Sequence, residues 1–71
     1  SVTKLIPRDL AKKYSLIPLE KVNRILSLVM ADPLNREVKL EMQQLTNCRI
    51  VPFIASMKEI DQAIQKSYGR F

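Results

Sequence analysis

Hydrophobic and polar positions recur along the chain in patterns that predict helices and strands. Pro7 begins the first helical pattern, because its fixed φ suits the start of a helix. Apolar side chains then follow at helical spacing: Leu10, Ala11 and Tyr14. The pattern predicts a short helix from Pro7 to Tyr14.

Two apolar runs after this helix predict neighbouring strands. Residues 16–19 contain Pro18, which has no amide hydrogen for a sheet ladder and therefore favours an edge strand. Residues 20–24 supply polar side chains for a turn. Residues 25–31 are apolar except for Ser27, as expected of a strand that is covered on both faces. The second run is therefore predicted as the central strand.

A second helix is predicted after Pro33, where the central strand must end. Either Asp32 or Asn35 can cap this helix through a side-chain oxygen. Residues 35–46 carry an apolar stripe at helical spacing, made of Val38, Met42 and Leu45. Asn47 tolerates a left-handed backbone and marks the end of the helix.

The last part of the chain predicts one more strand and one more helix. Residues 49–55 contain Pro52, so this strand is also expected at an edge. Ser56 and Glu59 have the spacing of a capping box. The apolar stripe that follows consists of Ile60, Ala63, Ile64 and Tyr68. Gly69, the only glycine, lies where a C-terminal cap is expected.

The order of these elements predicts the α/β (α+β) class, with the sequence α-β-β-α-β-α. The first two strands are close enough for an antiparallel hairpin, and a helical crossover makes the second and third parallel. Helices on one face of this three-stranded mixed sheet would give a small two-layer sandwich. The expected core is Leu28, Met30, Val38, Met42, Leu45, Ile60 and Ile64. The length of 71 residues suits a single domain, residues 1–71.

The residues that usually carry catalysis are scarce. The chain has no histidine and a single cysteine, Cys48, which is expected to be a small buried apolar residue. Asp32 and Glu37 fit a helix cap and a first-turn acid better than a catalytic pair. One glycine cannot build a phosphate-binding loop. The chain is therefore expected to contain no catalytic residue, cofactor or metal site, and not to be an enzyme by itself.

The formal net charge of +5 favours an acidic partner surface, a phosphate-bearing ligand or anionic lipid. The basic residues are dispersed, with only Lys12 and Lys13 adjacent, so no nucleic-acid interface is expected. No apolar stretch approaches the ~18 residues that a membrane span requires, and the first residues lack a signal-peptide pattern. A soluble cytoplasmic protein without membrane insertion is expected.

Several ordered fragments resemble one protein family. They are Ile6-Pro7 before Leu10-Ala11, Tyr14 with Leu16-Ile17-Pro18-Leu19, Leu28 to Asn35, Leu45-Thr46, Ile50-Val51-Pro52 and Ile54-Ala55-Ser56, and then Glu59-Ile60, Ala63-Ile64 and Tyr68-Gly69. Together they resemble the N-terminal domain of the bacterial type II secretion and type IV pilus assembly ATPases. The run from Met30 to Asn35 is the most specific of them.

Three departures from the family pattern bear on this resemblance. Asn47 stands where members commonly have glycine, and residues 22–24 replace a glycine or aspartate turn, which suggests different turns in the same fold. Some relatives bind cyclic di-GMP through motifs that begin with Arg-Leu-Gly, and this tripeptide does not occur here. A cyclic di-GMP-binding regulatory domain therefore remains only the alternative function.

The resemblance implies a non-catalytic adaptor in protein transport. In this family the module precedes the motor domain and docks on the cytoplasmic part of an inner-membrane secretion or pilus assembly protein. The chain is accordingly expected to be a piece of a longer ATPase or related regulator, held at the inner face of the membrane through its partners. Exposure and charge select Arg8, Asp9, Lys12 and Lys13 on the first helix as candidate partner-binding residues.

Overall fold

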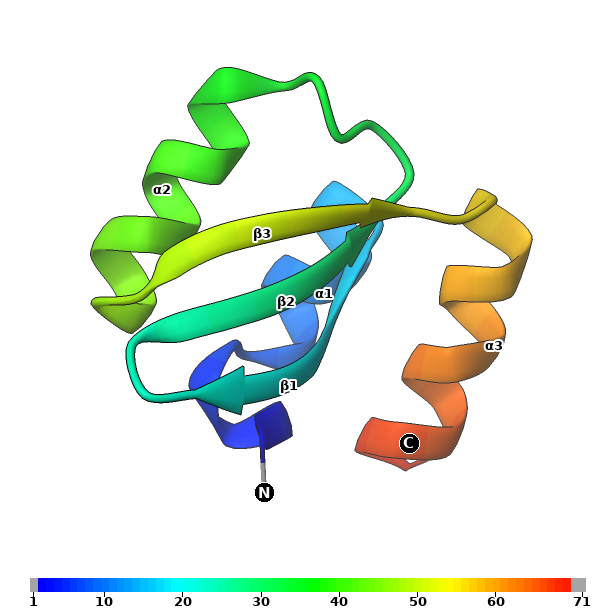
Figure 1. Cartoon of the computed structure of the whole chain (residues 1–71). Coiled ribbons are helices and arrows are strands. Elements are labelled where there is room, and N and C mark those ends of the chain that lie inside the picture. Colours follow the sequence, from blue (N-terminus) through cyan, green and yellow to red (C-terminus); the bar gives the residue numbers. More distant parts are fainter. Residues whose placement is uncertain (1, 70–71) are drawn as a thin grey trace.

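The computed structural model describes residues 2–69. Its elements, in chain order, are η1 (Val2–Leu5), α1 (Arg8–Tyr14), β1 (Leu16–Val22), β2 (Ile25–Met30), α2 (Arg36–Thr46), β3 (Arg49–Ile54) and α3 (Met57–Tyr68) (Figure 1). The α-helices and strands follow the predicted order α-β-β-α-β-α. The 3-10 helix η1 was not predicted, because four residues are too few to show a helical period.

The three strands form one mixed sheet in the order β1-β2-β3. The pair β1–β2 is antiparallel and the pair β2–β3 is parallel. The predicted topology is therefore confirmed, with β2 at the centre and a proline-containing strand at each edge.

Both edge prolines lie where a missing amide costs no ladder bond. The Ala31 amide donates to the Ser15 carbonyl, so the alternation of an antiparallel ladder makes Pro18, opposite Leu28, part of a non-hydrogen-bonded pair. In β3, the amide of Arg49 donates to Arg24, on the β2 side. The backbone groups of odd-numbered β3 residues therefore face β2, and those of even-numbered residues, including Pro52, point away from the sheet.

The first hairpin is longer than predicted. Residues 20–22, expected in a turn, continue β1 and pair with residues 25–27, while Leu19 forms a bulge. The turn contracts to two residues, in which Asn23 adopts a φ of 56°. These polar positions were mistaken for a turn because the end of the hairpin extends beyond the core, where strand residues need not be apolar.

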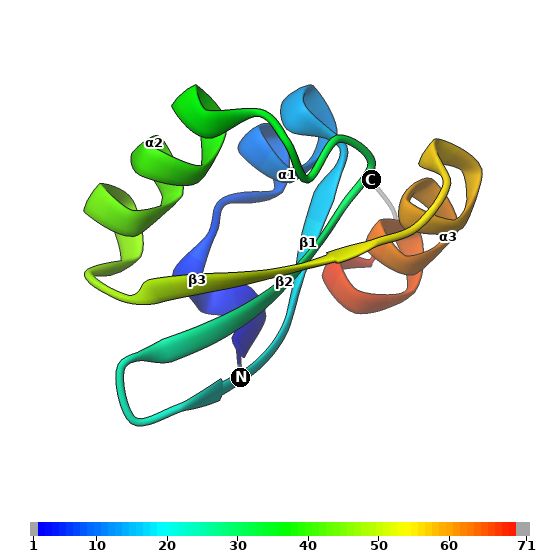
Figure 2. The ribbon, with the colours of Figure 1, turned by 45° about the horizontal axis from the view of Figure 1, so that its top comes forward.

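The helices leave much of one sheet face open. Figure 2 shows α1 and α2 on the same side of the sheet, whereas α3 lies beside β1. Accordingly, Leu26, Leu28 and Met30 of β2 are buried, but the intervening residues are half-buried and Ile25 is exposed. The prediction that both faces of this strand are covered was therefore wrong.

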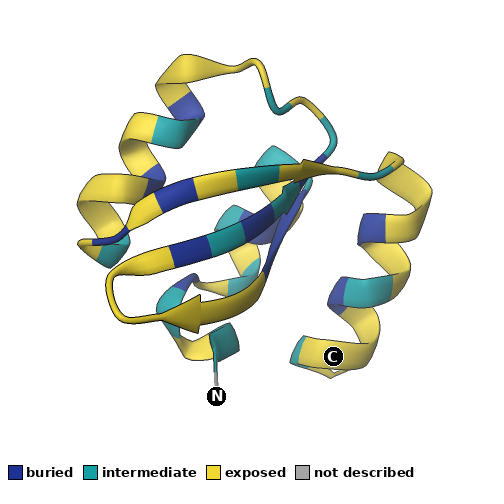
Figure 3. Cartoon of the chain, viewed as in Figure 1, coloured by how far each residue is buried: buried dark blue, intermediate teal, exposed yellow. Residues whose placement is uncertain are grey.

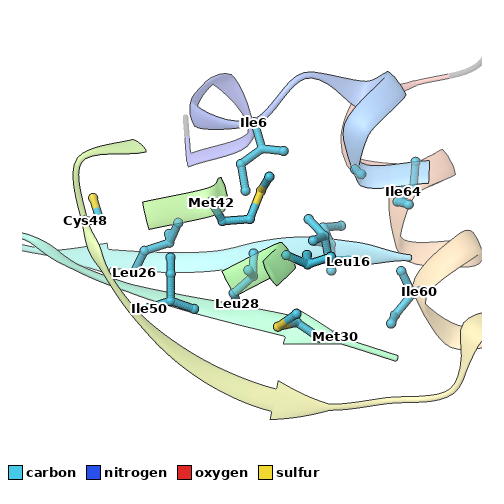
Figure 4. Packing of buried hydrophobic residues seen from close by; sticks show 13 residues of the cluster. Ile6, Leu16, Leu26, Leu28, Met30, Met42, Cys48, Ile50, Ile60 and Ile64 are labelled. Carbon is cyan, nitrogen blue, oxygen red and sulfur yellow. The ribbon is translucent and has the colours of Figure 1, made fainter. Parts of the chain in front are cut away.

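The core forms between the covered sheet face and helices α1 and α2, and Ile60 and Ile64 of α3 complete it from beside β1 (Figure 4). All of the predicted core residues except Leu45 are buried. Leu45 is 45% exposed, because it lies in the last turn of α2, at the end of the covered surface. Near this end of the core, beside Leu26 and Ile50, the side chain of Cys48 is buried instead, as predicted.

The helix ends follow the predicted capping residues. The Asn35 side chain accepts a hydrogen bond from the Val38 amide, which selects Asn35 over Asp32 as the cap of α2. Asn47 ends α2 with a φ of 54°, and Gly69 follows α3 with a φ of 80°. One detail differs: Pro7 is the extended residue before α1, with ψ of 146°, and not its first helical residue.

Candidate functional site

The four predicted partner-binding residues lie together on one side of α1. Residues four apart are neighbours on a helix, so Arg8 lies beside Lys12 and Asp9 lies beside Lys13. Asp9, Lys12 and Lys13 are exposed and Arg8 is half-buried, while Ala11 faces the core. We call these four residues the α1 face. Three cations and one carboxylate give it a net charge of +2.

The α1 face is held in place at the C-terminal end of the helix. Ser15 adopts a left-handed conformation with φ of 50° and ends α1. The Tyr14 hydroxyl donates a 2.8 Å hydrogen bond to Glu41 Oε1, which connects α1 to α2. Lys13 Nζ lies 5.2 Å from the centre of the Tyr14 ring, within cation–π range. The two lysines also lie where a helix favours positive charge.

A second candidate surface is the open face of the sheet, which the sequence analysis missed. Its exposed large apolar side chains come from all three strands: Val22 (57% exposed), Ile25 (44%), Val51 (38%) and Phe53 (50%). We call this set the open sheet face. Figure 3 shows exposed positions along all three strands. The available signal was the run of apolar residues at successive positions in β2 and in β3. The run in β2 was interpreted as burial on both faces, and β3 was predicted only as an edge strand.

An apolar hollow adjoins the open sheet face where α3 meets β1. It has a volume of about 540 Å³ and contacts η1, β1, β2 and α3. Ile17 and Val29, which pair with one another across β1 and β2, form its floor, and Ile60 and Ala63 of α3 form one wall. Among residues 2–69, Glu59 is the only charged side chain that lines it. Such a hollow can receive an apolar side chain, but it offers little to recognise an ion.

A second hollow, which is polar, lies beside the turn between β1 and β2. Arg24 and Arg49 line it together with side-chain amides of Gln43, Gln44 and Asn47, and the Arg49 amide donates to the Arg24 carbonyl over 2.7 Å. Cys48 also borders this hollow, but it is buried and its thiol donates to the Thr46 carbonyl over 3.3 Å. The thiol thus belongs to the core.

Among the residues that the structure describes, Glu59 and Tyr68 have shifted pKa values, and the hydrogen bonds of both stabilise the fold. Hydrogen bonds from the Ser56 amide and hydroxyl lower the pKa of Glu59. Burial raises the pKa of Tyr68, whose hydroxyl donates to the Ile6 carbonyl. Neither group belongs to the α1 face or the open sheet face.

The described part of the chain contains neither a metal-binding cluster nor a membrane-spanning helix. Among residues 2–69, no three side chains of the His, Cys, Asp and Glu types are grouped to hold a metal ion. Within the same residues, no helix has the length and hydrophobicity that crossing a membrane requires.

Comparison with known proteins agrees with the resemblance found in the sequence. The family described as the MshEN domain matches residues 1–71. The chain is also 30% identical over 68 residues to the type IV pilus assembly ATPase PilB of Myxococcus xanthus (strain DK1622). That match covers 96% of this chain and 12% of PilB, so the chain spans only a small part of this relative.

Proposed function

We propose that this chain, which belongs to the MshEN domain family, is a non-catalytic adaptor domain that docks a pilus-assembly or secretion ATPase on its assembly machinery. The observation that carries the proposal is the match of 96% of the chain to 12% of a type IV pilus assembly ATPase. A segment that makes up so little of an ATPase suits a recruiting role, with ATP hydrolysis assigned to the remainder of a longer protein.

The proposed partner is the cytoplasmic domain of an inner-membrane secretion or pilus assembly protein. Docking there would keep the ATPase at the cytoplasmic side of the inner membrane without insertion of this domain. We assign the contact to the α1 face, Arg8, Asp9, Lys12 and Lys13. Its net positive charge suits an acidic partner surface, and its attachment to α2 through Tyr14 and Glu41 gives a pre-organised support.

The test is a titration of the isotope-labelled chain with the cytoplasmic domain of such an assembly protein, followed by heteronuclear NMR. Binding should shift the amide signals of α1, and the affinity should fall with added salt because exposed charges are screened. Absence of binding by the folded chain would overturn the proposal.

Charge reversal tests the assigned face separately. The double variant Lys12→Glu, Lys13→Glu should bind at least about twofold more weakly, since two exposed ion pairs of about 0.2–1 kcal/mol each are lost. The matched control Lys58→Glu, Lys66→Glu changes the net charge equally at exposed positions of α3. Equal weakening in both variants would reject the α1 face as the contact and leave only a net-charge effect.

A further inference from the structure

We propose that the free edge of β3 and the adjoining face of α2 form an acceptor site for an extended peptide segment that alternates acidic and apolar residues. The segment would pair with β3 as a fourth strand of the sheet. This inference concerns a surface separate from the α1 face and does not depend on the docking proposed above.

The first observation is that one side of β3 has unpaired backbone groups. The amides of Arg49 and Ala55 donate to residues of the first hairpin, so the odd-numbered residues of β3 face β2. Ile50, Pro52 and Ile54 therefore turn their backbones outward, and no further strand lies beside them in the part of the chain that the structure describes. This edge offers the amides of Ile50 and Ile54 and the carbonyls of all three residues.

The second observation is a basic groove beside that edge. It has a volume of about 280 Å³ and is lined by Arg36, Lys39, Leu40, Gln43, Ile50 and Pro52. We call it the β3 groove. Its wall is a stripe of α2 at helical spacing, and both charged side chains in that stripe are cations. Glu41 lies on a different side of α2, where it accepts the hydrogen bond from Tyr14.

These two observations define the pattern of the added strand. Side chains of Ile50 and Pro52 point to the α2 side, and those of Val51 and Phe53 point to the open sheet face. Alternate residues of a fourth strand would therefore face Arg36 and Lys39 on one side. The residues between them would extend the open sheet face. Carboxylates suit the first set of positions and apolar side chains suit the second.

A second copy of the chain fits this edge poorly. In the symmetric antiparallel pairing of two β3 strands that is centred on Pro52, this residue would lie opposite its own copy, and both hydrogen bonds of that central pair would be missing. The two copies would also bring their Arg36 and Lys39 side chains together with like charge. Pro52 withholds the same hydrogen bond from every added strand, whereas Arg36 and Lys39 repel a basic strand and attract an acidic one. An acidic strand is therefore the favoured occupant.

The test uses the 71-residue chain and an end-blocked eight-residue peptide in which valine and glutamate alternate. Titration followed by NMR should shift the amides of Ile50 and Ile54 and the signals of α2 around Arg36 and Lys39, and should slow hydrogen exchange at both β3 amides. A matched peptide of alternating valine and lysine should bind at least about fivefold more weakly. Methylation of the peptide amides that face β3 should abolish binding, because it removes the donors to the β3 carbonyls.

A paired set of variants locates the site. The double variant Arg36→Glu, Lys39→Glu should bind the glutamate peptide more weakly and the lysine peptide more tightly than the unaltered chain does. The matched double variant Lys58→Glu, Lys66→Glu, at exposed positions of α3, should bind the glutamate peptide at the same site and within about twofold of the affinity of the unaltered chain. The peptide comparisons on the unaltered chain decide the proposal even if the α2 variant does not fold.

Four results would overturn the proposal. Equal binding of both peptides rejects the charge assignment, and equal binding of the methylated peptide rejects strand addition. Dimerisation of the free chain through protected β3 amides assigns the edge to a second copy. Absence of binding assigns Arg36, Lys39 and Pro52 to protection of an exposed edge.

Discussion

The hydroxyl of Tyr68 donates a 2.9 Å hydrogen bond to the backbone carbonyl of Ile6, which lies 62 positions earlier in the chain. The Ile6 side chain is fully buried, and Tyr68 packs against the same core. The bond therefore attaches the last turn of α3 to the segment that enters α1. Because α3 lies beside the sheet and not across its face, this contact contributes to holding the helix in position.

Replacement of Tyr68 by phenylalanine should lower the free energy of unfolding by about 1 kcal/mol, since a partly buried carbonyl loses its partner. Urea denaturation followed by circular dichroism measures this difference. The matched variant Tyr14→Phe removes a hydroxyl whose partner, Glu41, is exposed and can be hydrated. Tyr14→Phe should therefore lower the free energy of unfolding by less than Tyr68→Phe does. An equal or larger loss in Tyr14→Phe would contradict the importance assigned to the Tyr68 contact.

The same residue predicts a loss of stability in alkaline solution. Burial raises the pKa of Tyr68 above its ordinary value of 10.0, which means that the folded state favours the neutral phenol. The stabilisation is complete below pH 10 and is lost as the pH rises through the pKa of the folded protein. Unfolding curves measured from pH 8 upward should show this decline. The decline should be smaller in Tyr68→Phe, and an identical pH dependence in both proteins would contradict the assignment.

The capping box of α3 predicts a loss of stability in acid. Hydrogen bonds from Ser56 lower the pKa of Glu59 from 4.5, so the folded state favours the carboxylate. This contribution is present above pH 4.5 and is lost as the pH falls through the lowered pKa. Glu59→Gln should be less sensitive to acid over this interval, as judged by thermal unfolding between pH 3 and pH 6.

Ser56→Ala provides the control for this assignment. It removes the hydroxyl that caps the Glu59 amide and should lower stability by about 1 kcal/mol at neutral pH. The Ser56 amide still donates to Glu59 in this variant, so part of the acid sensitivity should persist. Complete loss of the pH dependence in Ser56→Ala would show that the hydroxyl, and not the backbone amide, sets the Glu59 pKa.

Local signals in the sequence were sufficient for much of the fold. Asn35 and Ser56 begin their helices as predicted, and Asn47 ends α2. Such caps depend only on side chains and backbone conformations within a few residues. Pro18 and Pro52 identified the edge strands for a similar reason. A proline has no amide hydrogen in any fold, so it favours an edge position for its strand however the rest of the chain is arranged.

The errors concern relations that a local pattern does not contain. The apolar run of β2 was consistent with burial on both faces, but α1 and α2 lie on the same side of the sheet. The exposure of Leu45 likewise depends on where the last turn of α2 ends relative to the sheet. The α1 face was predictable as a set of neighbours on one helix. The β3 groove was not, because it brings α2 and the edge of β3 together in space.

The contrast between the two sheet faces can be measured with one substitution on each. Leu28 is fully buried, so Leu28→Ala should lower the free energy of unfolding by about 2–5 kcal/mol through lost burial and a cavity. Phe53 is 50% exposed on the open sheet face, and Phe53→Thr keeps a residue that favours strands. We expect it to cost about 1 kcal/mol or less, because only part of the ring leaves an apolar environment. Urea denaturation of both variants tests this prediction. A loss at Phe53 as large as that at Leu28 would mean that the open sheet face is covered in solution.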